Sequence, residues 1–92
     1  MTLQGNVREA LTKYFEDELK SNLSLVDDYL EYEESTIKTQ NAIIRKRAEM
    51  QGYISCLDDL DVFEEDQIEF MYDKVYSAFE AKQERLDEKI AR

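Results

Sequence analysis

Apolar residues recur every three or four positions along most of this 92-residue chain. That spacing places them on one face of an α-helix, because the helix repeats about every 3.6 residues. The most regular stretch covers residues 61–90, where the apolar residues are Ile68, Met71, Tyr72, Val75, Ala78, Phe79 and Leu86. The pattern predicts a helix over residues 61–90 that packs this stripe against the rest of the chain.

The first part of the chain has the same periodicity over residues 6–20. Asn6 and Glu9 stand at its start in the arrangement of a capping box, in which each side chain accepts a hydrogen bond from the backbone of the other residue. Ser21 and Asn22 then favour a turn, because their side chains compete for backbone hydrogen bonds. The pattern therefore predicts a short first helix.

A second helix is predicted over residues 24–57, a length typical of a hairpin arm. Gly52 lies inside it, and the pattern leaves open whether the helix bends there or is continuous. Asp61 and Glu64 form a second capping pair at the start of the third helix. Since helices joined by a short turn pack antiparallel, the predicted fold is all-α. It consists of a short N-terminal helix packed on a long antiparallel helical hairpin, in a single domain of residues 1–92.

The composition favours helices alone. The chain has no proline and only two glycines, which are too few turn-forming residues for a series of strands and turns. Cys56 is the only cysteine, so no internal disulfide is possible and we expect a reducing compartment. Its apolar neighbours lead us to expect a buried, unreactive thiol. No apolar run approaches the roughly 20 residues of a membrane span, and no signal peptide is recognisable at the N-terminus. We therefore expect a cytoplasmic protein.

Acidic residues have a helical spacing of their own. Between residues 58 and 87 they follow one another at steps of three and four, interrupted only by Ser77, and so form a lengthwise ridge. The ridge consists of Asp58, Asp61, Glu65, Glu69, Asp73, Glu80, Glu84 and Asp87. A second acidic block, within residues 21–36, includes Asp27, Asp28, Glu31 and Glu34. These carboxylates are the candidate functional surface.

Basic residues are segregated from the acidic ones. One set lies to one side of the ridge and consists of Lys74, Lys82, Arg85 and Lys89. Another forms a block within residues 38–47 and consists of Lys38, Arg45, Lys46 and Arg47. The simplest interpretation of the block is that it pairs with acids of a neighbouring helix or a second subunit. A nucleic-acid patch is the weaker alternative, because the net charge of −10 opposes phosphate.

The residues of an enzyme site are missing from the sequence. There is no histidine, the commonest general base and metal ligand. The acids at residues 58–61 have neither the glycine nor the spacing of a calcium-binding loop, and there is no glycine-rich phosphate loop. Paired carboxylates acting as acid and base need a cleft that separates their pKa values, which a solvent-facing ridge does not provide. We therefore expect no enzymatic activity, no cofactor and no metal site.

The density of negative charge can be compared with that of DNA. Residues 58–73 carry eight acids and no base, and as a helix they would span about 24 Å. Duplex DNA carries about 14 charges over that length. One helix thus supplies a little over half of the duplex density, and a dimer that brings two such ridges or both acidic blocks together is needed to approach it.

With its acids at residues 27–34 and 58–87, this short chain resembles the phage DNA mimics. In size and acidity it is similar to the Arn-type anti-restriction proteins of T-even phages. The resemblance implies a homodimer in the host cytoplasm that contacts no nucleic acid and occupies the DNA-binding surface of a basic host protein. The implied targets are a restriction enzyme such as McrBC or a nucleoid protein such as H-NS.

Two functions from different classes thus remain open. In the first, the protein is a DNA-mimic inhibitor whose carboxylates replace phosphates. In the second, it is a helical adaptor or assembly protein that binds a partner through its apolar seam, with the acids serving only solubility. Tyr32, Tyr53 and Tyr76 are candidate interface anchors for a partner, because tyrosine tolerates half-exposure.

Overall fold

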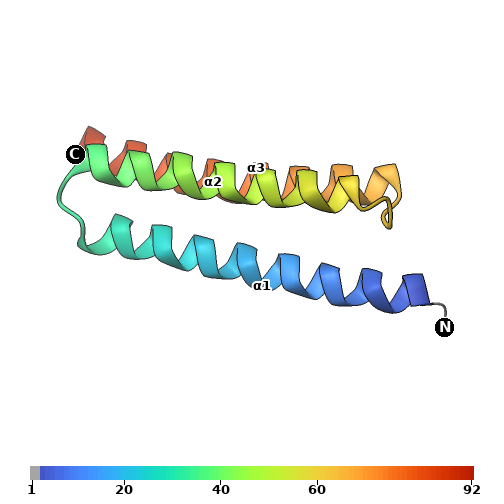
Figure 1. Cartoon of the computed structure of the whole chain (residues 1–92). Coiled ribbons are helices and arrows are strands. Elements are labelled where there is room, and N and C mark those ends of the chain that lie inside the picture. The colour runs from blue at the N-terminus through green and yellow to red at the C-terminus, as the bar shows by residue number, and fades with distance from the viewer. Residues whose placement is uncertain (1–2) are drawn as a thin grey trace.

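The computed structural model describes residues 3–92 and contains three helices of similar length (Figure 1). They are α1 (Leu3–Tyr32), α2 (Thr36–Asp59) and α3 (Glu65–Ala91). Each helix runs antiparallel to the one before it, and together they form a rod of 53 × 19 × 16 Å. The all-α prediction and the antiparallel pairing of the last two helices are confirmed.

One apolar stripe from each helix forms the core. The buried residues are Phe15, Leu19, Val26 and Leu30 of α1, Ile43, Met50, Ile54 and Leu57 of α2, and Ile68, Met71, Val75, Phe79 and Leu86 of α3. Most follow one another at steps of three and four, the spacing that lets neighbouring helices pack at small crossing angles. The stripe predicted for α3 is confirmed at its main positions, and Tyr72 lies at its exposed edge.

The prediction of a short N-terminal helix over residues 6–20 is wrong. Ser21 and Asn22 lie in the middle of α1, and Asn22 is buried. The reason is that Leu19, Val26 and Leu30 continue one stripe into the core. Burial of that stripe outweighs the local preference of serine and asparagine for a turn.

The second helix, predicted over residues 24–57, is instead divided at residues 33–35. Ser35 caps the start of α2, where its Oγ accepts a hydrogen bond from the backbone N–H of Lys38 at 3.2 Å. The carboxylate of Glu33 accepts one from the backbone N–H of Ser35, also at 3.2 Å. Side chains thus satisfy the free backbone groups at this break. Beyond it α2 is continuous through Gly52.

Lys89, near the end of α3, closes the other side of this turn. Its Nζ donates hydrogen bonds to the backbone carbonyls of Leu30 and Glu33, both at 3.0 Å. A cation is favourable there, because the last carbonyls of a helix lack intrahelical partners and carry partial negative charge. The contact ties the C-terminal end of α3 to the end of α1.

Both predicted capping pairs are wrong. α3 begins at Glu65 rather than residue 61, and its N-cap is Glu64, whose N–H donates to Gln67 Oε1 at 2.8 Å. Asp61 lies in the turn with a φ of 57°, a left-handed conformation that aspartate tolerates better than most residues. Asn6 lies inside α1, which already begins at Leu3.

The cysteine prediction is also wrong. Cys56 is exposed because it lies on the outward face of α2, between the buried residues Ile54 and Leu57. Its apolar neighbours therefore did not show where its own side chain points. None of the helices, over the residues described, combines the length and the hydropathy needed to cross a bilayer.

Candidate functional site

The acidic ridge is an exposed face of α3. The predicted ridge residues on this helix, all exposed, are Glu65, Glu69, Asp73, Glu80, Glu84 and Asp87. They lie on the side away from the buried stripe, over a length of about 33 Å. The first part of the predicted ridge is not on this helix, because Asp58 belongs to the end of α2 and Asp61 to the turn. Both are exposed at the end of the rod where α3 begins.

The four basic residues of α3 all contact α1. Lys74 Nζ lies 4.0 Å from a carboxylate oxygen of Glu16. Lys82 Nζ and Arg85 Nη1 lie 2.6 Å and 2.8 Å from the same oxygen of Asp27. Together with the Lys89 contacts at the end of α1, these interactions give the segregation of the bases a structural cause. The bases join α3 to α1, and the acids of α3 are left facing solvent.

Asp27 therefore differs from the other candidate residues. Its carboxylate is half-buried and is engaged by the two cations of α3. The remaining candidate residues are exposed and form no ion pair with another residue of the described part of the chain; they are Asp28, Glu31, Glu34, Asp58, Asp61, Glu65, Glu69, Asp73, Glu80, Glu84 and Asp87. Asp27 therefore stabilises the packing of α3 on α1, whereas the other candidate carboxylates are accessible from solvent.

The free acids are distributed over the length of the rod. Asp28, Glu31 and Glu34 lie near the turn between α1 and α2, and Asp58 and Asp61 lie near the turn between α2 and α3. Figure 1 shows these two turns at opposite ends of the molecule, with α3 spanning the distance between them. The α3 ridge thus connects two acidic ends.

The basic block lies on the first half of α2. Lys46 pairs with Glu49 of the same helix at 3.2 Å. Lys38 and Arg45 are exposed, Arg47 is half-buried, and none of the three forms an ion pair within residues 5–92. The expected pairing of these three residues with acids of a neighbouring helix is therefore not present in this part of the chain.

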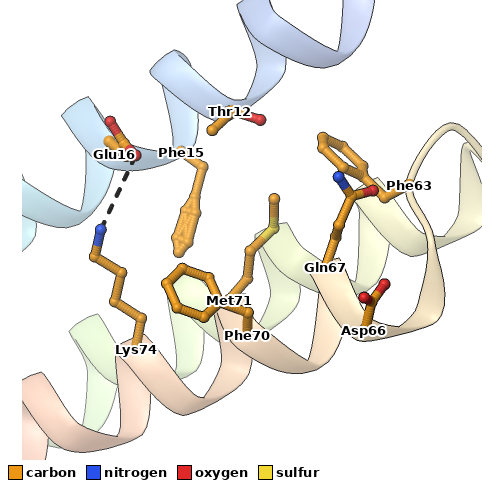
Figure 2. Close-up of a pocket in the computed structure, with 9 residues that line it drawn as sticks. All are labelled: Thr12, Phe15, Glu16, Phe63, Asp66, Gln67, Phe70, Met71 and Lys74. Atoms are coloured by element: carbon orange, nitrogen blue, oxygen red, sulfur yellow. Dashed lines mark ion pairs between the residues drawn. The ribbon is translucent and has the colours of Figure 1, made fainter. Parts of the chain in front are cut away.

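A groove between α1 and α3 was not predicted from the sequence. It measures about 390 Å³, and its apolar walls are Phe15, Phe63, Phe70 and Met71 (Figure 2). Phe70 stands off the buried stripe of α3, and 66% of its surface is exposed. The sequence signal that could have indicated the groove is Phe70, a large apolar residue that does not follow the spacing of the buried stripe. The depth of the groove depends on how α1 crosses α3, which the sequence did not reveal.

Three aromatic residues meet in the part of the α1–α2 interface nearer the α2–α3 turn. The rings of Tyr14 and Tyr53 are 5.4 Å apart, and Phe15 lies edge-on to Tyr53 at 6.5 Å. The Tyr53 hydroxyl is buried and has no hydrogen-bond partner among the described residues. Burial, with smaller contributions from Tyr14 and Glu18, raises the pKa of Tyr53 above its usual value of 10.0. Of the predicted anchors, Tyr32 and Tyr76 are exposed and Tyr53 is largely a packing residue.

Within the described residues, no three acidic or cysteine side chains are grouped closely enough to hold a metal ion. Comparison with protein-family models, curated proteins and solved structures finds no match to this chain.

Proposed function

We propose that this protein is a DNA-mimic inhibitor that occupies the DNA-binding surface of a basic protein. The observation that carries the proposal is the α3 ridge, whose exposed carboxylates run along the rod without ion pairs in the described structure. In the complex, the target's lysines and arginines pair with these carboxylates as they would with phosphates. A restriction enzyme or a nucleoid protein fits this description of a target.

The charge density favours a dimer as the active form. One chain carries a net charge of −10 over a rod 53 Å long. Duplex DNA of that length carries about 31 charges. Two chains side by side supply about two thirds of that number, whereas one supplies about one third.

The outward face of α2 is suited to pair two chains. It exposes Ile37 and Ile44, at 73% and 50%, beside the small residues Ala48 and Gly52. A Cβ atom built at Gly52 meets nothing within 4 Å, so this part of the face is open to the approach of another helix. Covering the face with a second copy buries the apolar side chains and leaves α3 accessible.

The charges along α2 favour an antiparallel pairing. Its first half is basic, with Lys38 and Arg45, and it ends in the acidic pair Asp58 and Asp59. An antiparallel pair centred on Ala48 places the basic half of each chain against the acidic end of the other. In that register Ile44 of one chain lies opposite Gly52 of the other, and Lys38 lies opposite Asp58. A parallel pair would instead place like charges together.

A crosslinking experiment tests this dimer. In a Cys56→Ser background, an Ala48→Cys variant brings two thiols together at the two-fold axis and should form a disulfide-linked dimer under mild oxidation. The wild-type protein is the control, because in this register its two Cys56 thiols are separated by about 24 Å along the helices. Efficient crosslinking through Cys56 would contradict the register, and sedimentation as a monomer at all concentrations would contradict the dimer.

The inhibitor function is tested by capturing partners from nuclease-treated bacterial lysate with the tagged protein. We expect DNA-binding proteins to be retained and to be released by added duplex DNA or by raised salt, because the contacts are ionic. Retained proteins unrelated to DNA that survive both treatments would contradict the proposal.

A charge-neutralised variant then tests the ridge itself. Replacing Glu69, Asp73 and Glu80 by their amides should weaken binding to a captured target by about tenfold or more. The matched control neutralises Glu9, Asp17 and Glu88, which are exposed acids outside the candidate surface, and so changes the net charge equally. An equal loss in both variants would mean that net charge alone, and not the ridge, attracts the target.

A helical adaptor is the second candidate function, and the groove between α1 and α3 favours it. An adaptor would bind its partner mainly by burying apolar surface, so raised salt would change the affinity little. The neutralised ridge variant separates the two functions, because an adaptor would keep its partner when Glu69, Asp73 and Glu80 are amides.

A further inference from the structure

The groove of Figure 2 has an apolar floor that the fold already provides. Phe15 points from α1 toward Phe70 and Met71 of α3, and Phe63 closes the end nearest the α2–α3 turn. Phe15 and Met71 are core residues, with 2% and 6% of their surfaces exposed, so the floor is part of the packed core. The volume of about 390 Å³ lies within the range of sites that enclose a small ligand or a large side chain.

Polar side chains also line the groove. Thr12 of α1 and Gln67 of α3 face it, and the helices are joined across it by the 4.0 Å ion pair of Lys74 with Glu16. A second hollow shares Glu16 and Lys74 with the groove and lies farther along α1 and α3, where Leu19 and Leu23 line it. A peptide chain can therefore lie along the boundary with one side chain in the groove.

The rim of the groove carries negative charge. Glu16 and Asp66 stand at its edges, and Asp66 forms no ion pair with another described residue. Glu65 and Glu69 flank Asp66 on the exposed side of α3. The one cation of the rim, Lys74, is held by Glu16 and lies 6.0 Å from the centre of the Phe70 ring. The occupant that matches this rim is basic around an apolar centre.

We propose that this groove receives one large apolar side chain, aromatic or long aliphatic, from a basic peptide segment of the partner. The proposal rests on the proposed function for the basic character of the partner, and it adds a contact that DNA itself does not make. Phe70 forms the exposed wall and stacks on the inserted side chain, while Asp66 and Glu69 pair with the flanking lysines or arginines. Such a buried anchor gives a charge-based binder selectivity among basic proteins.

Two short lysine-rich peptides, alike except for tryptophan or alanine at one central position, test the groove. We expect the tryptophan peptide to bind about tenfold tighter or more, with a blue-shifted tryptophan emission, because burial of a large aromatic side chain favours binding. In a Phe70→Ala variant this advantage of tryptophan should largely disappear. Tyr76→Ala is the matched control, since Tyr76 is another exposed aromatic residue of α3 that does not line the groove, and it should keep the advantage.

The outcomes separate this proposal from the proposed function. Equal affinity of the two peptides, or a tryptophan advantage that survives Phe70→Ala, overturns the groove, even if both peptides bind in a strongly salt-dependent manner. A tryptophan advantage that Phe70→Ala removes supports the groove. If that advantage persists while amides at Asp73 and Glu80, two ridge acids that do not line the groove, leave binding of a captured target and its salt dependence unchanged, the groove stands and the DNA-mimic function fails. Circular dichroism verifies that each variant is folded.

Discussion

Replacing Gly52 by alanine should make the single chain more stable and the proposed dimer weaker. Gly52 lies in the interior of α2 with no positive φ, so its backbone does not need glycine. A Cβ atom placed there meets nothing within 4 Å, so an alanine fits without strain. Glycine in an exposed helix interior costs about 1 kcal/mol relative to alanine, because it loses more backbone freedom on folding. No contact within the chain offsets this cost.

The expected gain for the single chain is therefore about 1 kcal/mol, which for a domain of this size raises Tm by about 4–8 °C. The dimer should respond in the opposite direction. In the antiparallel register the methyl group at position 52 meets Ile44 of the other chain, where overpacking costs about 1–3 kcal/mol. Each dimer contains two such contacts, so self-association should weaken by about tenfold or more.

Two measurements on one set of samples check this prediction. Urea unfolding at low protein concentration gives the stability of the single chain, and sedimentation over a range of concentrations gives its self-association. A variant that is no more stable than the wild type would refute the assignment of an open, unstrained position. A gain in stability with unchanged self-association would mean that the dimer contact lies on another face. Gln51→Ala on the same helix is the control for a change in helix propensity alone.

Other variants probe the core, the internal ion pairs and the buried hydroxyl. Phe79→Ala should destabilise by about 3–5 kcal/mol in chemical denaturation because this ring is 1% exposed, whereas Phe70→Ala should cost less than about 1 kcal/mol. Asp27→Asn removes both cation contacts and should cost about 1 kcal/mol or less, a difference that shrinks in high salt, since the pairs are partly exposed. Tyr53→Phe should stabilise by about 1 kcal/mol at neutral pH, because it removes an unpartnered buried hydroxyl. The stability difference between Tyr53→Phe and wild type should grow above about pH 10. There the unfolded wild type loses the Tyr53 proton, while the folded state, with its raised pKa, retains it. A difference that shrinks above that pH would contradict the burial of this hydroxyl.

The helical fold and the contacts of α3 were predictable because a single regular pattern determines them. The apolar stripe that contains Ile68, Val75 and Phe79 fixes which face of α3 is buried. Once that face is known, the carboxylates on the opposite side must be exposed. The antiparallel arrangement of α2 and α3 follows from the short turn between them.

The first turn was not predictable in the same way, because local and tertiary preferences disagree there. Ser21 and Asn22 favour a turn locally, yet they lie between core positions of α1 and remain helical. The actual break at residues 33–35 contains two glutamates, which are good helix formers. It is stabilised by the Ser35 cap and by Lys89, a residue more than fifty positions away. No local pattern reveals a cap supplied by another helix.

The candidate site shows the same division between local and distant information. Exposure of the α3 ridge could be predicted from the periodicity, but the role of Asp27 could not, because its cations come from α3 and approach only in the folded bundle. The groove depends likewise on how α1 crosses α3. Phe63 and Phe70 are separated from Phe15 by more than half of the chain.

The structure also changes how the separation of charges is to be explained. The sequence shows acids and bases of α3 on different sides, and the fold accounts for the bases, since Lys74, Lys82, Arg85 and Lys89 all reach α1. It does not account for the acids of the ridge, which contact no cation among the described residues. A surface that mixes positive and negative charges is enough to keep a protein soluble. A row of charges of one sign adds repulsion between them, which lowers the stability of the fold. The fold therefore explains the position of the bases but not that of the ridge, which is why we propose a basic surface outside the chain as the partner of the ridge.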